Sequence, residues 1–288
     1  MSVLRWPAVK TLLLLLCLSL LISACSRAGL AYRNLDWLVP WRLNDYLNLD
    51  SQQQAWLKPR LQTHLQWHCS AELPRYIDWL QTTESILAQP QPDSAQLLEQ
   101  FAQFDAALKR IGVEITPTAI ELLQGLSEQQ VRELYAAMDE DNLEDRQDFL
   151  DPPLATQISE RQSRMQERLH AWLGRLNTAQ VEHVQAWANT LGEQNRVWLE
   201  NRQRWQAELR STIAERSQAD FAERLTRLLQ QRESFYSDEY RARYAASRRA
   251  LAHLFSQLLS SSDAAQRERL GHRLRDLRRD LAEQQCSA

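Results

Sequence analysis

The chain contains 288 residues, and its 34 basic and 37 acidic side chains leave a formal net charge of −3 at pH 7. Because neither sign is concentrated in one run, the charge pattern argues against a nucleic-acid-binding protein. The six glycines and the scarcity of β-branched runs argue against a sheet protein and against glycine-rich phosphate loops, whereas the abundance of Leu, Ala, Gln, Glu and Arg favours helices.

The first 24 residues have the three regions of a secretory signal peptide. Arg5 and Lys10 precede a leucine-rich run that is shorter than the roughly 20 apolar residues of a transmembrane helix. The segment 22–24 then leads directly into Cys25. This ending resembles the lipobox of bacterial lipoproteins more than a plain signal peptide. The resemblance implies cleavage after Ala24 and acylation of Cys25, and several acyl chains would anchor the mature protein stably.

The residue after the cysteine indicates the destination membrane. In lipoproteins of this type an aspartate at that position marks retention at the inner membrane, and here the residue is Ser26. The resemblance therefore implies a lipid-anchored protein on the periplasmic side of the outer membrane. Residues 1–24 then form the signal peptide, and residues 25–48 form a membrane-proximal tether with short helices.

Two tryptophans lie in this tether. Trp37 and Trp41 flank Pro40, which we expect to separate two short helical turns. We expect both rings to pack onto the body of the protein, because no Lys/Arg-rich polar face accompanies them. The alternative is a position at the lipid headgroups, where tryptophan is favoured.

From residue 50 onward the sequence predicts one helix after another. The expected helices span 50–72, 74–88, 93–111, 117–124, 127–148, 153–174, 177–214, 218–234, 238–259 and 262–284. A break at 151–153 separates an N-terminal helical region, 49–150, from a C-terminal long-helix region, 151–288. Within 177–214, a seven-residue spacing predicts a coiled-coil-like seam of Val184, Leu191, Trp198 and Trp205. The predicted fold is all-α, an elongated up-and-down assembly of long antiparallel hairpins.

Two cysteines remain in the mature chain besides Cys25. In the oxidising periplasm Cys69 and Cys286 can form a disulfide that would tie the first long helix to the last. The alternative is two free thiols, and the spacing in the sequence leaves both open.

A helix-start motif recurs three times along the chain. It consists of a leucine, a small polar residue and, three positions later, a glutamine, and its members are Leu49, Asp50 and Gln53; Leu126, Ser127 and Gln130; and Leu176, Asn177 and Gln180. The small polar residue caps free amides of the first turn, and the glutamine reaches back to the N–H of the cap. Each motif therefore predicts a capping box.

These motifs and the N-terminal segment carry two resemblances. The helix starts are similar to the Leu-Thr-x-x-Gln motifs of Spy/CpxP-type periplasmic proteins, although Asp50, Ser127 and Asn177 stand in place of threonine. That resemblance implies an all-helical, ATP-independent chaperone with a concave surface for unfolded clients. The lipobox and the segments 32–38 and 49–53 resemble an uncharacterised family of Gram-negative lipoproteins. This second resemblance implies an all-helical lipoprotein and no particular activity.

Residues that could support catalysis or bind a metal are sparse. His64 and His68 lie four positions apart, but the adjacent Cys69 is offset from the face that the two histidines share. No Gly-x-Ser-x-Gly turn occurs, and no acidic run has the spacing of an EF-hand loop. We therefore predict no catalytic residue, no metal site, no cofactor and no small-molecule substrate.

A cluster of tryptophan and arginine near residue 200 has two interpretations. Trp198, Trp205 and Arg202 belong to the residue types that dominate binding hot spots, so they could contact a protein partner. Alternatively, the rings fill a core that is poor in Phe and Met. We expect a non-enzymatic protein that binds other proteins, with a chaperone-like or envelope-stress role. The alternative is an assembly subunit that docks onto one specific envelope partner.

Overall fold

The computed structural model describes residues 32–284 and Cys286. The predicted signal peptide, its cleavage site at Ala24 and the predicted lipidation site Cys25 lie outside these residues. Among the helices that are described, none combines the length and the apolar character needed to cross a bilayer.

All regular secondary structure between residues 32 and 284 is helical, which confirms the predicted all-α class. The helices are α3 (Leu35–Leu47), α4 (Ser51–Trp67), α5 (Leu73–Leu87), α6 (Ser94–Gln124), α7 (Glu128–Phe149), α8 (Leu154–Leu173), α9 (Thr178–Leu191), α10 (Gln194–Ala214), α11 (Phe221–Gln230), α12 (Asp238–Ser260) and α13 (Ala264–Ala282). A π-helical turn, His68–Glu72, joins α4 to α5, and a 3-10 turn, Arg232–Phe235, follows α11.

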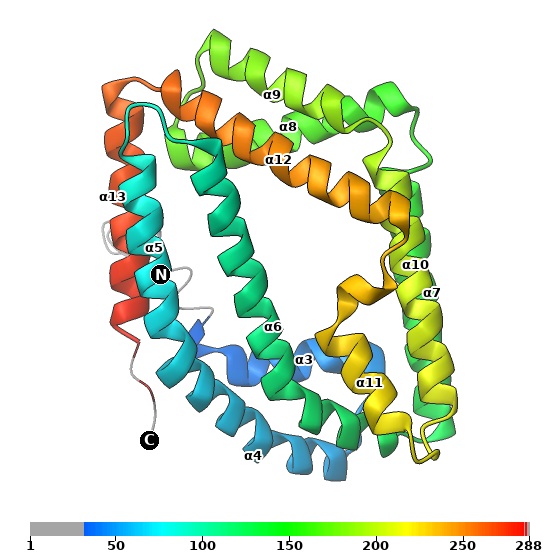
Figure 1. Ribbon diagram of the computed structural model, residues 1–288. Coiled ribbons are helices and arrows are strands. Elements are labelled where there is room, and N and C mark those ends of the chain that lie inside the picture. The colour runs from blue at the N-terminus through cyan, green and yellow to red at the C-terminus, as the bar shows by residue number, and fades with distance from the viewer. Residues whose placement is uncertain (1–31, 285, 287–288) are drawn as a thin grey trace, which may run out of the picture.

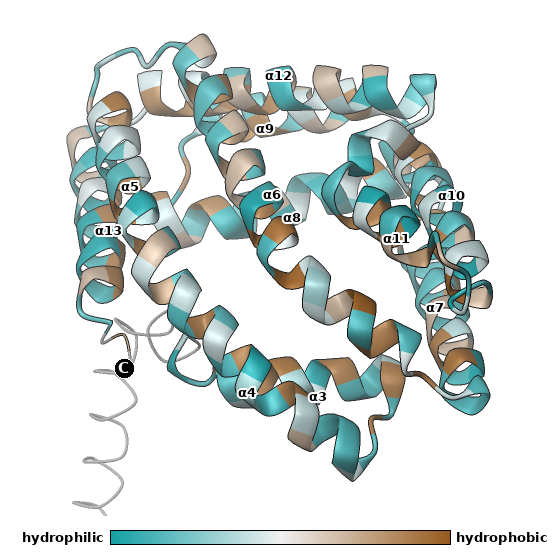
Figure 2. Cartoon of the chain, turned by 60° about the horizontal axis from the view of Figure 1, so that its bottom comes forward, coloured by the Kyte–Doolittle hydropathy of each residue, from teal (hydrophilic) through white to brown (hydrophobic). Residues whose placement is uncertain are grey.

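The helices pack side by side around a frame (Figure 1). In that view α5 and α13 form the left side, α8, α9 and α12 the top, α7 and α10 the right side, and α3 and α4 the bottom, while α6 and α11 cross the interior. Hydrophobic and hydrophilic residues are mixed along each helix (Figure 2), as expected for helices that pack on neighbours with one face only.

Two main hydrophobic clusters stabilise the frame. The first includes Leu122, Val131, Ile213 and Phe221, and the second joins Leu80 to buried side chains of α8, α9, α12 and α13. Each cluster contains side chains from before and after residue 150. The regions 49–150 and 151–288 therefore share both clusters.

The expected single helix over 177–214 is wrong. The chain breaks between α9 and α10 at Gly192, whose φ of 49° lies in the left-handed region that favours glycine. As a result the proposed seam does not exist as one line: Val184 belongs to the second cluster, whereas Trp205 packs against the first. The opposite correction applies to α6, which continues through Pro117 where we expected two helices. Packing of α6 across the frame offsets the cost of an internal proline.

The tether is also different from the expectation. Pro40 lies inside α3, which is one helix and not two short turns. The face of α3 that packs on the body is occupied by Leu43, Tyr46 and Leu47. The rings of Trp37 and Trp41 point away from it and are 62% and 55% exposed, so the prediction that they pack onto the body is wrong.

The three predicted capping boxes are present, at Asp50, Ser127 and Asn177. A fourth box, which the sequence analysis missed, begins α13 with Asp263 and Gln266. At this helix start a serine, and not a leucine, precedes the cap. Each box satisfies amides that would otherwise lack partners in the first turn of its helix.

The structure brings the four boxes together in two pairs. Gln130 donates from Nε2 to Oε1 of Gln53 at 2.6 Å, and Gln53 donates back at 3.1 Å. In the same way Gln180 and Gln266 exchange hydrogen bonds of 2.9 and 3.0 Å. Each glutamine therefore caps its own helix and also holds a second helix that is distant in sequence.

Replacing Gln180 by leucine should lower the free energy of unfolding by about 2–4 kcal/mol, because buried partners lose their hydrogen bonds. Gln180 is fully buried, and its Nε2 also donates to the carbonyl of Leu258 and the hydroxyl of Ser262. Urea unfolding measures the loss. Gln129→Leu is the control, since Gln129 is exposed and its side chain donates a hydrogen bond to Glu133 on its own helix. Equal effects of the two variants would contradict the prediction.

Candidate functional site

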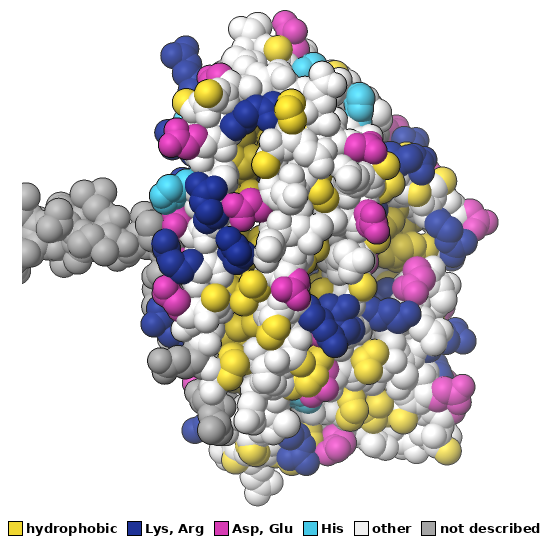
Figure 3. All heavy atoms as spheres, turned by 60° about the vertical axis from the view of Figure 1, so that its left-hand side comes forward, with side chains coloured by type: hydrophobic (Ala, Val, Ile, Leu, Met, Phe, Trp, Pro, Cys, Tyr) yellow, Lys and Arg dark blue, Asp and Glu magenta, His cyan; other side chains and the backbone are white. Residues whose placement is uncertain are grey.

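A groove lies between α5 and α6, and α13 contributes to one side of it. Its cavity volume is about 1080 Å³. The two helices diverge from the turn that connects them (Figure 1), so their facing surfaces separate along their length. The face that includes α5 and α13 exposes hydrophobic side chains between charged ones (Figure 3). This groove is the candidate functional site.

The groove has an apolar floor and an apolar rim. Leu80, Ile86 and Ala107 line it and are buried. Phe104 and Leu108 of α6 also line it, yet they are 53% and 51% exposed. Large hydrophobic side chains that are half exposed next to a cavity favour ligand binding, because a bound ligand would bury their remaining apolar surface.

The polar side chains of the groove include several amides as well as charged groups. Trp79 donates from Nε1 to the backbone carbonyl of Gln100 at 3.2 Å, which fixes its ring between α5 and α6. Four further glutamines line the cavity: Gln81, Gln89, Gln96 and Gln103. An amide side chain both donates and accepts hydrogen bonds, so these residues can pair with the backbone of a bound polypeptide whatever its sequence.

A buried ion pair closes one end of the groove. Glu72, in the π-helical turn, is completely buried and accepts two hydrogen bonds of 2.8 Å from Arg110 of α6. Arg75 donates a third, of 2.6 Å. The hydrogen bonds from Arg110 lower the pKa of the Glu72 carboxyl, so Glu72 stays charged and continues to hold α6 to the start of α5.

His68 and the two cysteines lie near this ion pair. His68 is hydrogen-bonded at its two ring nitrogens by the hydroxyls of Tyr32, at 3.1 Å, and Tyr76, at 3.2 Å. Burial lowers the pKa of His68 and raises the pKa of Tyr32 to about 12. Cys69 and Cys286 form a disulfide with a sulfur–sulfur distance of 2.01 Å, which ties the π-helical turn to the segment that follows α13.

His64 has its own partners on α6. Its Nδ1 lies 3.0 Å from a carboxylate oxygen of Glu114, and its Nε2 lies 2.7 Å from the hydroxyl of Thr118. Within the part of the chain that the structure describes, no group of three His, Cys, Asp or Glu side chains could hold a metal ion.

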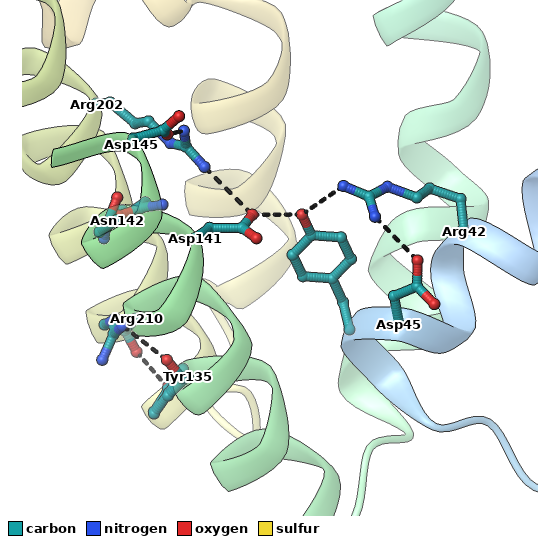
Figure 4. Close-up of polar contacts among 10 residues, drawn as sticks. Arg42, Asp45, Tyr135, Asp141, Asn142, Asp145, Arg202 and Arg210 are labelled. Atoms are coloured by element: carbon teal, nitrogen blue, oxygen red, sulfur yellow. Dashed lines mark hydrogen bonds and ion pairs between the residues drawn. The ribbon is translucent and has the colours of Figure 1, made fainter. Parts of the chain in front are cut away.

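The predicted partner-binding residues of α10 are used within the chain. Arg202 forms ion pairs with Asp141 and Asp145 of α7, and Asp141 also accepts a 2.5 Å hydrogen bond from Tyr46 of α3 (Figure 4). Arg42 donates to the same tyrosine hydroxyl at 3.1 Å. This network connects α3, α7 and α10.

Both tryptophans of α10 are half-buried. Trp205 donates from Nε1 to the carbonyl of Leu228 at 3.1 Å, and Trp198 contacts Phe149 edge to face at 6.2 Å. A second cavity of about 410 Å³ borders them. Both rings nevertheless pack mainly against neighbouring helices, as expected if they fill the core.

Phe104 and Leu108 were not predicted as site residues from the sequence. Leu97, Phe101, Phe104 and Leu108 follow the spacing i, i+4, i+7, i+11, so they share one face of α6. Leu97 is buried, and Phe101 packs against Phe255 of α12. The spacing was visible in the sequence, but it does not show that the second half of the face is left uncovered.

One comparison with known proteins gives a match. A family model described as "Family of unknown function (DUF6279)" matches residues 45–241, a range that contains α5 and α6 and therefore most of the groove. The match agrees with the predicted membership of an uncharacterised family and says nothing of Spy/CpxP-type proteins. No curated protein and no solved structure matches the chain.

Proposed function

Because the chain belongs to the DUF6279 family of unknown function, we propose its function from its own groove: it is a non-enzymatic protein that binds apolar segments of other proteins between α5 and α6. The activity is chaperone-like and needs no nucleotide. The protein works from the periplasmic side of the outer membrane, to which a lipid on Cys25 anchors it.

The observation that carries this proposal is the exposure of Phe104 and Leu108 inside a groove of about 1080 Å³. An apolar segment bound there would cover Phe104 and Leu108 on the rim and the buried floor. The glutamines along the groove would satisfy the backbone of that segment without selecting its side chains. This combination suits many clients more than one substrate.

Two further features support the proposed compartment. The lipobox and Ser26 favour export and anchoring at the outer membrane. The disulfide between Cys69 and Cys286 suits an oxidising compartment such as the periplasm.

The test uses purified residues 26–288 and a chemically denatured client protein that scatters light as it aggregates. We expect the protein to suppress scattering at a few-fold molar excess and without nucleotide. An unchanged aggregation rate at every ratio would refute the chaperone-like activity. In that case a photocrosslinker at position 104 that captures a single stoichiometric partner in cells would instead indicate an assembly subunit.

A further inference from the structure

The outer face of α3 exposes two stacked tryptophans. The rings of Trp37 and Trp41 lie 6.0 Å apart with an angle of 10° between their planes, and they are 62% and 55% exposed. They are one helical turn apart, so they form one continuous aromatic surface. The opposite face of α3 already packs on the body through Leu43, Tyr46 and Leu47. Folding of the described chain therefore leaves this surface uncovered.

The position of α3 along the chain determines what can lie next to it. Seven residue steps separate Cys25 from Tyr32, a span of at most roughly 25 Å when fully extended. The hydroxyl of Tyr32 is hydrogen-bonded to His68 on the body, which holds the start of the described chain in place. A lipid on Cys25 would consequently keep α3 close to the bilayer surface.

The chemistry of the face suits the headgroup region. Tryptophan is favoured at membrane interfaces because its ring is apolar while its N–H remains hydrogen-bonded to water or headgroups. The charges near the two rings balance in sign and do not favour anionic lipids: Arg42 is paired with Asp45 at 2.9 Å, and Arg33 and Asp36 are both exposed. Contact with the membrane should therefore depend on the aromatic rings and only weakly on salt.

We propose that the Trp37–Trp41 face of α3 inserts into the headgroup region of the membrane that anchors Cys25. This inference rests on the lipid anchor of the proposed function. The insertion orients the body, because α3 lies at the edge of the frame opposite α8, α9 and α12 (Figure 1). The edge with α8, α9 and α12 then faces away from the membrane.

The test uses the full lipidated protein in phosphatidylcholine vesicles that contain a lipid brominated near the headgroup end of its acyl chains. Bromine quenches nearby tryptophan. We expect quenching of the wild type, and a loss of at least about half of the quenched component in the Trp37→Phe/Trp41→Phe variant. Trp172→Phe is the control, since Trp172 is 37% exposed and lies on α8 at the opposite edge, and it should retain the quenching.

Equal quenching of the wild type and the double variant, or none in the wild type, would overturn the inference. So would quenching that disappears at raised salt, which would indicate an electrostatic contact. Measuring the intact mass of the same sample tests the lipid anchor separately from the insertion of the tryptophans. An unmodified Cys25 overturns the anchor and the inference together, whereas a lipidated protein without quenching overturns the inference alone and leaves client binding in the groove intact.

Discussion

The Phe104→Asp/Leu108→Asp variant is expected to lose the suppression of client aggregation while it keeps its fold. Both side chains are about half exposed, so carboxylates at these positions remain hydrated and cost little stability. A bound apolar segment, in contrast, would have to desolvate two charges where it previously covered two apolar side chains. Since burial of one such side chain contributes about 1.5–3 kcal/mol, binding should weaken at least about tenfold.

Light scattering of the denatured client measures this loss, and circular dichroism with thermal unfolding verifies the fold. Leu143→Asp is the matched control, because Leu143 is 55% exposed on α7 and does not line the groove. We expect the control to suppress aggregation as the wild type does. If the double variant also remains active, the clients bind elsewhere and the groove is not the site.

The Cys69→Ser/Cys286→Ser variant should lose up to about 5 kcal/mol of unfolding free energy by the chain-entropy model of cross-links. The bridge closes a loop with a sequence separation of 217 residues, so its removal greatly increases the freedom of the unfolded chain. In the native state the loss of the disulfide also removes the covalent link between the C-terminal end of the chain after α13 and the π-helical turn. We therefore expect faster hydrogen exchange in the last turns of α13.

Urea unfolding with and without a reducing agent supplies the measurement and its control. The reducing agent should lower the stability of the wild type to that of the double variant and leave the double variant unchanged. A wild type that is insensitive to the reducing agent, with unreacted thiols at both cysteines, would show that the bridge is absent in solution.

Helix starts were the part of the fold most accessible from sequence. The boxes at Asp50, Ser127 and Asn177 were predicted residue by residue, because a cap and its glutamine interact within a single turn. The pairing of these glutamines across helices was not predictable. Gln180 and Gln266 are separated by 86 positions, and nothing in either local sequence indicates the other.

Errors arose where a local signal competed with packing. Pro40 and Pro117 were expected to interrupt helices, but neighbouring helices hold α3 and α6 together through both positions. Gly192 was ignored because the apolar seven-residue spacing continues across it. In the structure the glycine takes a positive φ and redirects the chain from α9 to α10.

The all-α class and the helix caps follow from residue types and short-range spacing, since helix formation and capping involve neighbours within about one turn. The sequence left the pairing of Cys69 with Cys286 open, and only the tertiary structure brings these two residues together. Which apolar faces stay open depends on the paths of whole helices. Leu97 and Phe104 lie on the same face of α6, yet Leu97 is buried and Phe104 is exposed. The reason is that α5 and α6 diverge along their length (Figure 1). In α3 the inner face alone fits the body, so Trp37 and Trp41 remain outside. Both surfaces are products of three-dimensional packing that no local pattern encodes.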